Sequence, residues 1–378
     1  MYAIKRELKL NNTEQSYCMG CAGFSRFVYN FGLGLLSSSW SLDIKMSDFL
    51  RIDYIKKVFT NHLKKDANYA WTNKYSSRIY QHAFMNLKSA FKRWRDGSLK
   101  AEIPQFKKKR HQCSFTVDSS NGKVLVKAGK SIKIPTLATF RLKEAIPYNC
   151  ISQTFTISRE AGRWYVSFMV NACPYREMNH TEKVVGVDLG VKTFATLSDG
   201  RTIGAPSYYK TAKTKLSKLQ WRNRNKVLGI RRQGIKASNN AQKYYDKLRR
   251  KYQKVANVRE DFLQKETTKL AKTYQEVKIE DLNIKGMLAN HKLADAISSL
   301  GFYRFRELLT YKQHWYGSLL TVVDRWFPSS KTCSSCGHIQ PMPLKQRTYA
   351  CGGCGLTIDR DLNAAMNLER WVKYSADG

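Results

Sequence analysis

The chain is poor in acidic residues and contains no long hydrophobic run. It has 29 Asp and Glu against 66 Lys and Arg, so its 378 residues carry a formal charge of +37. A compact protein with this excess repels itself unless a polyanion neutralises the charge, and we therefore expect nucleic acid as the partner. No stretch approaches the roughly 20 apolar residues that span a bilayer, and residues 1–10 lack the apolar core of a signal peptide. We expect no membrane partner.

The chain also lacks internal repeats and an even set of cysteines. Its 42% hydrophobic and 12% aromatic residues exclude global disorder, and its length allows two or three domains. Nine cysteines, an odd number with four of them in two tight pairs, indicate metal ligands and free thiols in a reducing compartment.

The four paired cysteines predict a structural zinc ribbon. Cys333 and Cys336 form one C-x-x-C knuckle, Cys351 and Cys354 form another, and each knuckle continues to a glycine. Four thiolates complete a tetrahedral Zn²⁺ site and leave no open position for catalysis. A redox site needs one reactive C-x-x-C rather than a matched pair. His338 is expected to be a loop residue because the ligand set is already complete.

A third C-x-x-C, formed by Cys18 and Cys21, has no second pair nearby. We interpret it as two residues of a helix at i and i+3, not as half of a zinc site.

Three acidic residues stand at the ends of predicted elements in the second half of the chain. Asp188 follows the apolar residues 184–187, Glu280 follows 277–279, and Asp361 opens a predicted helix. The order of elements there is three strands, helix, strand, helix, strand, helix, which is the order of the ribonuclease-H-like fold. In that fold the strands ending at Asp188 and Glu280 can be neighbours, and the closing helix can bring Asp361 alongside.

Three converging carboxylates can hold two divalent cations about 4 Å apart for phosphodiester hydrolysis. Mg²⁺ suits such oxygen ligands, so Asp188, Glu280 and Asp361 are the candidate catalytic and metal-binding residues. Asp361 is preferred to Asp359 because it begins the helix that could project into the site. Three basic residues close in sequence to these elements are either phosphate contacts or surface charge: Arg325, Lys331 and Arg360.

The first half of the chain predicts one strand, a helical region and then a β region. Residues 2–10 alternate as a strand, and residues 13–95 have helical spacing of apolar side chains. The helices either form a bundle with a solvated basic face or lie on a nucleic-acid backbone. The basic run Lys107, Lys108, Lys109 and Arg110 precedes the β region and is expected to contact phosphate. Residues 114–170 predict a small barrel or sandwich that includes the first strand.

The second half predicts a linker at 174–181 and then a mixed α/β domain. Its strands are expected at 183–188, 193–198, 202–203, 276–280 and 318–324, and its helices at 208–272, with a break near 229–234, and at 302–317 and 361–372.

These motifs together resemble one family, the TnpB (OrfB) proteins of insertion sequences, which are related to the type V CRISPR nucleases. The resemblance is dense from residue 183 to the last helix. It rests on the sequence around Asp188, on Glu280-Asp-Leu-Asn-Ile-Lys-Gly, on residues 324–337 with the first knuckle, and on residues 351–365 with the second. It is looser at residues 25–30 and 103–107.

The resemblance implies an RNA-guided DNA endonuclease with a single RuvC-like site. It implies a multidomain α+β fold. The first domain is an oligonucleotide-binding-like β-barrel wedge, with residues 1–10 as its first strand, 11–103 as an inserted helical recognition lobe, and 104–180 as the rest of the wedge. The second is a ribonuclease-H-like nuclease domain at 181–378, with a zinc-ribbon insertion at 326–358. The expected cofactors are two Mg²⁺, with Mn²⁺ as a substitute, one structural Zn²⁺ and a guide RNA.

The same resemblance implies target double-stranded DNA with a short flanking motif, one protein per guide RNA, and a prokaryotic cytoplasmic location at the nucleoid. Base contacts in the helical lobe are assigned to three polar residues of a predicted helix region: Lys74, Tyr80 and Gln81. The sequence is also compatible with three alternative functions. They are a miniature type V CRISPR effector, a nuclease-silent RNA-guided repressor, which would be expected to lose an acid of the triad, and a transposase that joins DNA strands itself.

Overall fold

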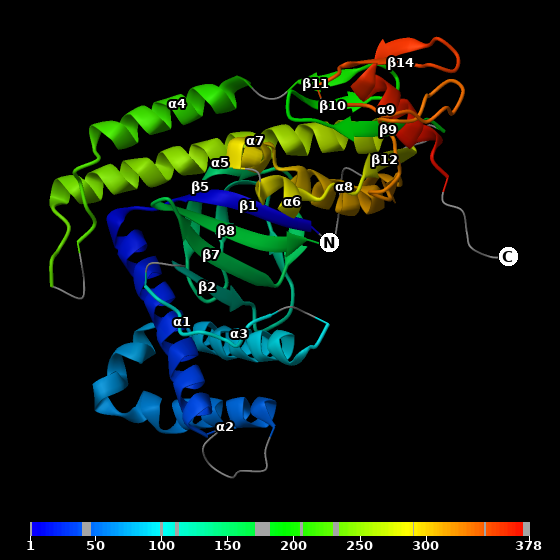
Figure 1. The fold of residues 1–378 in the computed structure, drawn as a ribbon. Coiled ribbons are helices and arrows are strands. Elements are labelled where there is room, and N and C mark those ends of the chain that lie inside the picture. Colours follow the sequence, from blue (N-terminus) through cyan, green and yellow to red (C-terminus); the bar gives the residue numbers. More distant parts are fainter. Residues whose placement is uncertain are drawn as a thin grey trace. The chain divides into compact units, whose positions relative to one another are not determined.

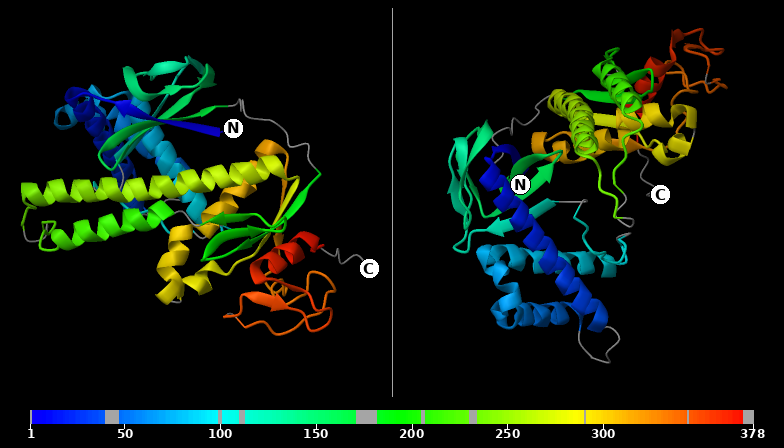
Figure 2. Two further views of the ribbon diagram at one scale, coloured as in Figure 1. Left: turned by 90° about the horizontal axis from the view of Figure 1, so that it is seen from above. Right: turned by 90° about the vertical axis from the view of Figure 1, so that its left-hand side faces the viewer.

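The computed structural model describes residues 2–39, 47–98, 101–109, 113–170, 182–204, 207–229, 234–289, 291–343 and 345–372. They belong to two compact units, Met1–Cys173 and Pro174–Gly378 (Figures 1 and 2). The predicted linker 174–181 lies outside the described residues. Within the described ranges, no helix is long and apolar enough to cross a membrane.

The helices of the first unit begin at polar caps and bury aromatic faces. α1 (Asn12–Ser39) is one continuous helix of 28 residues. Serine caps precede the next two α-helices, because Ser47 accepts from the Leu50 N–H and Ser76 from the Arg78 N–H. The helical segments that follow α1 are α2 (Asp48–Asn61), η1 (Leu63–Lys65), η2 (Ala67–Lys74) and α3 (Ser77–Arg95).

The sheet of the first unit combines the start of the chain with strands that follow the helices. Its order is β2-β7-β8-β1-β5-β4, and β3 and β6 form a separate pair. β1 runs antiparallel to β8 from Tyr2↔Val170 to Leu8↔Trp164. Among the described residues no pairing joins the edge strands β2 and β4 into a closed barrel. The strands are β1 (Tyr2–Lys9), β2 (Cys113–Asp118), β3 (Val124–Val126), β4 (Gly129–Lys133), β5 (Thr139–Ile146), β6 (Cys150–Ser152), β7 (Thr154–Glu160) and β8 (Arg163–Val170).

Helices and sheet of the first unit share one hydrophobic core. Phe24 of α1 and Phe91 of α3 belong to the same buried cluster as Phe115 of β2 and Phe168 of β8. The residues before and after position 103 therefore pack as one body.

The sheet of the second unit is mixed, with the order β11-β10-β9-β12-β13. β12 runs parallel to both β9 and β13, while β10 runs antiparallel to β9 and β11. The predicted adjacency of the two acid-bearing strands, β9 and β12, is confirmed. The strands are β9 (Val184–Leu189), β10 (Thr193–Leu197), β11 (Thr202–Gly204), β12 (Glu276–Glu280) and β13 (Leu319–Val323).

Alternate residues of β9 and β12 face opposite layers of helices. Val185, Val187, Val277 and Ile279 are buried with the apolar side chains of α5 and α8. Since successive side chains of a strand point to opposite faces, Gly186, Asp188, Lys278 and Glu280 share the other face, which α9 covers (Figure 1). Both acids therefore lie on the α9 side of the sheet.

Six α-helices of the second unit are described: α4 (Ser207–Arg222), α5 (Asn239–Thr273), α6 (Ile284–Ala289), α7 (His291–Leu300), α8 (Phe302–Tyr316) and α9 (Arg360–Arg370). α4 and α5 form the predicted antiparallel pair and lie side by side in every view (Figures 1 and 2). The sequence did not predict α6 and α7, because neither has a long periodic pattern of its own.

A buried lysine joins α5 to α8. Lys312 is only 1% exposed. Its Nζ donates to the Gln264 carbonyl and to the hydroxyls of Thr267 and Thr268, each at 2.7 Å. Burial lowers the pKa of Lys312 to about 8, although all three of its donors have acceptors.

Candidate active site and metal centre

Asp188 and Glu280 are brought together by the register of β9 and β12. Val187 pairs with Ile279 in the parallel ladder, and each acid is the next residue on its strand. Neighbours in register on parallel strands point to the same face. The two carboxylates therefore stand side by side at the carboxyl ends of these strands.

Two residues beneath α9 set how closely that helix approaches the acids. A Cβ on Gly186 would lie 1.9 Å from the Ala365 carbonyl oxygen and 2.5 Å from the Glu369 nitrogen. α9 therefore rests directly on the backbone of β9. From the neighbouring strand, Lys278 Nζ donates to the Glu369 and Trp371 carbonyls at 2.9 and 2.8 Å. A cation at these last carbonyls also complements the helix dipole.

The start of α9 separates the roles of its two aspartates. Asp359 is the N-cap, and its Oδ1 accepts from the N–H groups of Asp361 and Leu362 at 2.9 and 3.1 Å. Asp361 lies in the first turn, where a negative charge is favourable, and it lines the same cleft as Asp188 and Glu280. The capping bonds engage the carboxylate of Asp359 and leave Asp361 to face the cleft.

The cleft that holds the three acids has a volume of about 810 Å³. Five basic residues also line it: Lys192, Arg325, Lys331, Arg347 and Arg360. Three of these were predicted from the sequence. Lys192 and Arg347 were missed because neither lies in a motif, and only folding brings them to the site.

Burial and like charges act on the acids of the cleft. Burial, and then the charges of Asp361 and Glu280, raise the pKa of Asp188 to about 7. Burial and the charge of Asp281 also raise the pKa of Glu280. Cations partly offset this repulsion: the charge of Arg360 acts to lower the pKa of Asp188, and Arg347 Nη1 lies 3.9 Å from Asp361 Oδ2. A set of carboxylates whose ionised forms repel one another fits a divalent metal, which would stabilise them in the charged state.

Asp281 holds two arginines beside the acid pair. Its Oδ1 accepts from Arg306 Nη1 at 2.6 Å, and its Oδ2 accepts from Arg325 Nε at 3.1 Å. The hydrogen bond from Arg325 is the main reason that the pKa of Asp281 is lowered. Its backbone N–H also donates to the Val323 carbonyl at 3.0 Å, so this residue ties β12 to the end of β13.

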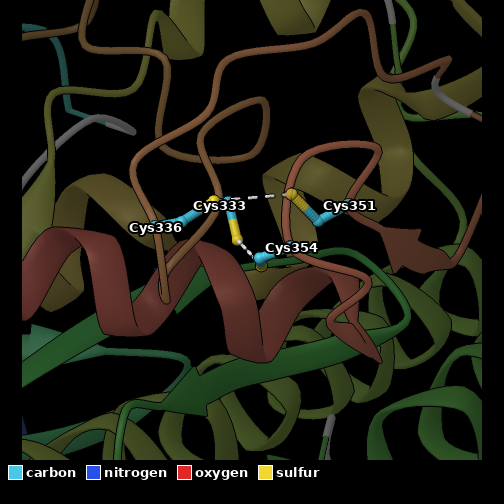
Figure 3. Close-up of side chains that lie close together, drawn as sticks. All are labelled: Cys333, Cys336, Cys351 and Cys354. Atoms are coloured by element: carbon cyan, nitrogen blue, oxygen red, sulfur yellow. Dashed lines mark hydrogen bonds between the residues drawn. The ribbon is translucent and has the colours of Figure 1, made fainter.

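The four predicted zinc ligands converge from two matched knuckles (Figure 3). Their sulfur atoms all lie within 4.8 Å of one another. In each knuckle the glycine after the second cysteine has a positive φ, 77° at Gly337 and 74° at Gly355, and donates to the carbonyl of the first cysteine at 3.0 Å. His338 is exposed and is not part of the sulfur cluster. The set fits a tetrahedral Zn²⁺.

Two asparagines of α9 fasten the first knuckle to the acid-bearing helix. Asn363 accepts from the Ser334 N–H at 2.9 Å and donates to the Thr332 carbonyl at 2.7 Å. Asn367 donates to the Ser329 and Thr332 carbonyls, also at 2.7 Å. Both side chains are buried. Both asparagines lie on one face of α9, four residues apart, but they were not predicted, because asparagine is most often exposed.

Two family models and a relative of known sequence match this chain. Residues 167–291 match the OrfB family model described as "Probable transposase", and residues 302–368 match a Cas12f1-like TNB domain. A protein of Streptomyces pristinaespiralis is 32% identical over 369 residues, which cover 94% of this chain and 84% of that protein. The chain belongs to the TnpB family.

Other relatives are consistent with membership of the TnpB family. The Streptomyces protein and InsQ of Escherichia coli K12 both bear the name "Putative RNA-guided DNA endonuclease", and InsQ is 28% identical over 97% of this chain and 91% of its own. A TnpB-like protein of Acanthamoeba polyphaga mimivirus is 29% identical over 62% of this chain and 47% of its own. Among solved structures, a Cas12f1 complex with guide RNA and target DNA has a TM-score of 0.56 at 13% identity, with 95% of this chain and 83% of that one covered, so the fold is shared.

The looser TnpB motifs of the first unit meet in space. Asn30 and Lys107 exchange two hydrogen bonds, from Asn30 Nδ2 to the Lys107 carbonyl at 3.0 Å and from the Lys107 N–H to Asn30 Oδ1 at 2.8 Å. Lys107 Nζ lies 3.9 Å from the centre of the Tyr29 ring. Lys108 and Lys109 are exposed, and Arg110 lies outside the described residues.

Of the three residues assigned to base contact, one was placed wrongly. Tyr80 is only 7% exposed and packs against Phe59 at a ring distance of 5.3 Å. The buried face of α3 includes Tyr80 and also His82. Gln81 is half-buried and accepts from Arg78 at 2.9 Å, whereas Lys74 is exposed at the end of η2.

Cys18 and Cys21 lie on the buried face of α1. Burial raises the pKa of each thiol to about 12. They are packed, unreactive thiols at helical spacing, as predicted.

Proposed function

We propose that this TnpB protein is an RNA-guided DNA endonuclease that hydrolyses phosphodiester bonds in the acid-lined cleft of its second unit. The observation that carries the proposal is the convergence of Asp188, Glu280 and Asp361, from two strands and a helix, in one cleft. The guide RNA and the DNA substrate are inferred from its relatives, which are named as RNA-guided DNA endonucleases. A nuclease-silent repressor is disfavoured because all three acids are present.

Asp188, Glu280 and Asp361 would hold two Mg²⁺ ions, with Mn²⁺ as a substitute. The ions, when bound, supply an activated water and charge stabilisation at the leaving oxygen. Asp188 must be ionised to bind metal, so the proton retained because of its raised pKa leaves when metal binds. Lys192, Arg325, Lys331, Arg347 and Arg360 would bind the phosphates on either side of the cut.

The second unit is proposed to be a RuvC-like nuclease domain of ribonuclease-H-like topology. The sheet order β11-β10-β9-β12-β13, with β9 and β10 antiparallel and β12 parallel to β9, supports this assignment. The sulfur cluster would hold one structural Zn²⁺. It would act on the reaction only by fixing the loop that lines the cleft.

The first unit is proposed to combine a wedge of oligonucleotide-binding type with a helical recognition lobe. An antiparallel sheet that recruits the first strand, with the helices between, supports this reading. Its exposed basic residues, Lys74, Lys108 and Lys109, would contact the guide RNA or the flanking motif. We assign one protein to each guide RNA.

The test is to purify the protein expressed from its native locus, sequence the bound RNA, and assay the complex on matching double-stranded DNA. We expect a discrete structured RNA whose end matches flanking DNA, and cleavage that requires Mg²⁺. Asp188→Ala, Glu280→Gln and Asp361→Asn should each abolish detectable cleavage while RNA binding persists, because each removes a ligand of the proposed metal pair.

Asp261→Asn is the matched control, because Asp261 is an exposed acid of α5 paired only at the surface with Lys265. It should cleave like the unmodified protein. Heterogeneous host RNA, or strand transfer of a transposon end without RNA, would overturn the proposal in favour of an unguided nuclease or transposase.

A further inference from the structure

Trp326 stands exposed at the rim of the acid cleft. Its 84% exposure exceeds that of every other large apolar side chain in the described ranges. It lines the same cleft as Asp188 and Glu280. Within the part of the chain that the structure describes, no aromatic or cation–π contact involves its ring. A tryptophan is the largest apolar surface that a side chain can offer, and here that surface faces solvent beside the acids.

The backbone around Trp326 is held by hydrogen bonds. Its N–H donates to Asp324 Oδ1 at 2.7 Å, and the next N–H, of Phe327, donates to the Asp324 carbonyl at 3.1 Å. The preceding Arg325 is fixed by Asp281 at 3.1 Å. The turn starts directly after β13, beside Glu280 of β12. The backbone that carries the ring is thus held beside the strand that ends at Glu280.

The charges around the ring indicate its occupant. The five basic residues of the cleft favour a polyanion, and Arg325, the neighbour of Trp326, is one of them. A flat aromatic side chain in a basic groove is the arrangement that binds single-stranded nucleic acid, because a base can stack on the ring while its phosphates meet the cations. In a duplex the face of each base is covered by the next base pair. An unpaired base has a free face and can take this position.

We propose that Trp326 stacks on an unpaired base of the DNA strand being cut, one or a few nucleotides from the scissile phosphate, and so selects single-stranded DNA at the cleft. The inference rests on the proposed nuclease function and adds a substrate-binding residue to it. The ring fixes the strand laterally, while Arg325 and the other cations hold the phosphates.

The test is an abasic scan. The guide-RNA complex is given single-stranded target DNAs, each with one abasic nucleotide at a different position around the cut. With the unmodified protein, one position should raise KM by about 10-fold or more, the size expected for the loss of one base stack, with a smaller change in kcat. Trp326→Ala should raise KM for the intact strand by a similar factor, and the abasic nucleotide should then have no further effect. Trp326→Phe should restore most of the binding and the sensitive position.

Trp221→Ala is the matched control, since Trp221 is an exposed tryptophan of α4, 67% exposed, in the same unit. It should retain the abasic profile of the unmodified protein. Equal abasic profiles for Trp326→Ala and the unmodified protein, or an unchanged KM, would overturn the inference while cleavage itself persisted. Absence of cleavage by the unmodified complex would instead contradict the proposed function. An unchanged melting temperature and zinc content of Trp326→Ala show that its fold is intact.

Discussion

Asp188 destabilises the metal-free protein because folding brings its carboxylate into a buried site with two other acids. Its pKa is raised to about 7 in the folded protein, against about 3.9 in an unfolded chain. Between these two pH values the folded protein holds a proton that the unfolded chain has released. Stability therefore falls as the pH rises from about 4 to about 7 and then levels off.

We predict that Asp188→Asn stabilises the magnesium-free protein at pH 8 by on the order of 2 kcal/mol, since the amide keeps the shape and removes the charge. The advantage should shrink at pH 5, where the folded Asp188 is protonated. Urea unfolding at the two pH values measures it, and added Mg²⁺ should narrow the gap at pH 8 by stabilising the unmodified protein. A stability difference between Asp188→Asn and the unmodified protein that does not change with pH would show that folding does not raise the pKa of Asp188.

The sequence alone identified the three acids that the fold brings into one cleft. The three acids could be named from the sequence because each ends or begins a recognisable element. Asp281 could not, because its role depends on Arg306 and Arg325, which lie 25 and 44 residues away along the chain. Tyr80 was misassigned for a related reason: on a helix, a hydroxyl says little about which face is buried.

At the scale of elements, the contact between α9 and β9 positions Asp361. The contact is backbone to backbone at Gly186, so it has no flexible side chain that could give way. A helix displaced from this strand would carry Asp361 away from Asp188.

We predict that Gly186→Ala lowers stability by about 2 kcal/mol or more, because neither backbone can move without breaking its own hydrogen bonds. Cleavage should fall even where the protein still folds. Gly204→Ala is the control, a strand glycine of the same sheet with open space at its Cβ position, and it should change stability little. Thermal unfolding and cleavage rates of the two variants test this prediction. Equal losses of stability and cleavage in the two variants would argue against a close approach of α9 to β9.

The junction of α5 and α8 gives a second prediction at this scale. Burial lowers the pKa of Lys312 to about 8, below the roughly 10.4 of an unfolded lysine. Between these pH values the unfolded chain holds a proton that the folded protein has released, so stability rises with pH. We predict that the unmodified protein gains on the order of 1 kcal/mol relative to Lys312→Met between pH 7 and pH 9.5. Unfolding in urea at both pH values tests this.

The exposed Lys265→Met is the matched control, because Lys265 also lies on α5 but pairs with Asp261 at the surface. Its stability difference from the unmodified protein should not shift in the same way. A Lys312→Met difference that is constant with pH would show that the buried amine does not titrate in this range.

At the scale of the whole molecule, the four-cysteine cluster and the acid cleft form one connected structure in the second unit. Asn363 and Asn367 tie the first knuckle to the helix that carries Asp361. In the described residues the cysteine module has a small buried cluster around Tyr349, so a bound metal would supply much of its folding free energy.

We predict that Cys336→Ser lowers zinc content, melting temperature and cleavage together. Loss of one of four thiolates opens the site, and the knuckle then no longer anchors α9. Metal analysis and thermal unfolding measure the first two effects. Cys113→Ser, a thiol of the first unit outside the cluster, should retain its zinc. A Cys336→Ser protein with full zinc would contradict the ribbon.

The sequence by itself determined the types of metal ligand and many of the helices and strands, but not α6 and α7. Spacing is enough for the knuckles, for β12 and for the helical pair α4 and α5, because local periodicity and ligand spacing do not depend on distant residues. The sequence also predicted a polyanionic partner, since net charge is independent of fold.

Tertiary structure alone decided which face of each element is buried and which distant residues meet. Lys278 reaches the end of α9, Asn30 binds the Lys107 backbone, and Trp326 stands at the cleft rim. None of these follows from a local pattern. The two hydrogen-bonded contacts join residues that are 77 or more positions apart in the chain. The position of Trp326 depends on a cavity that several elements build together.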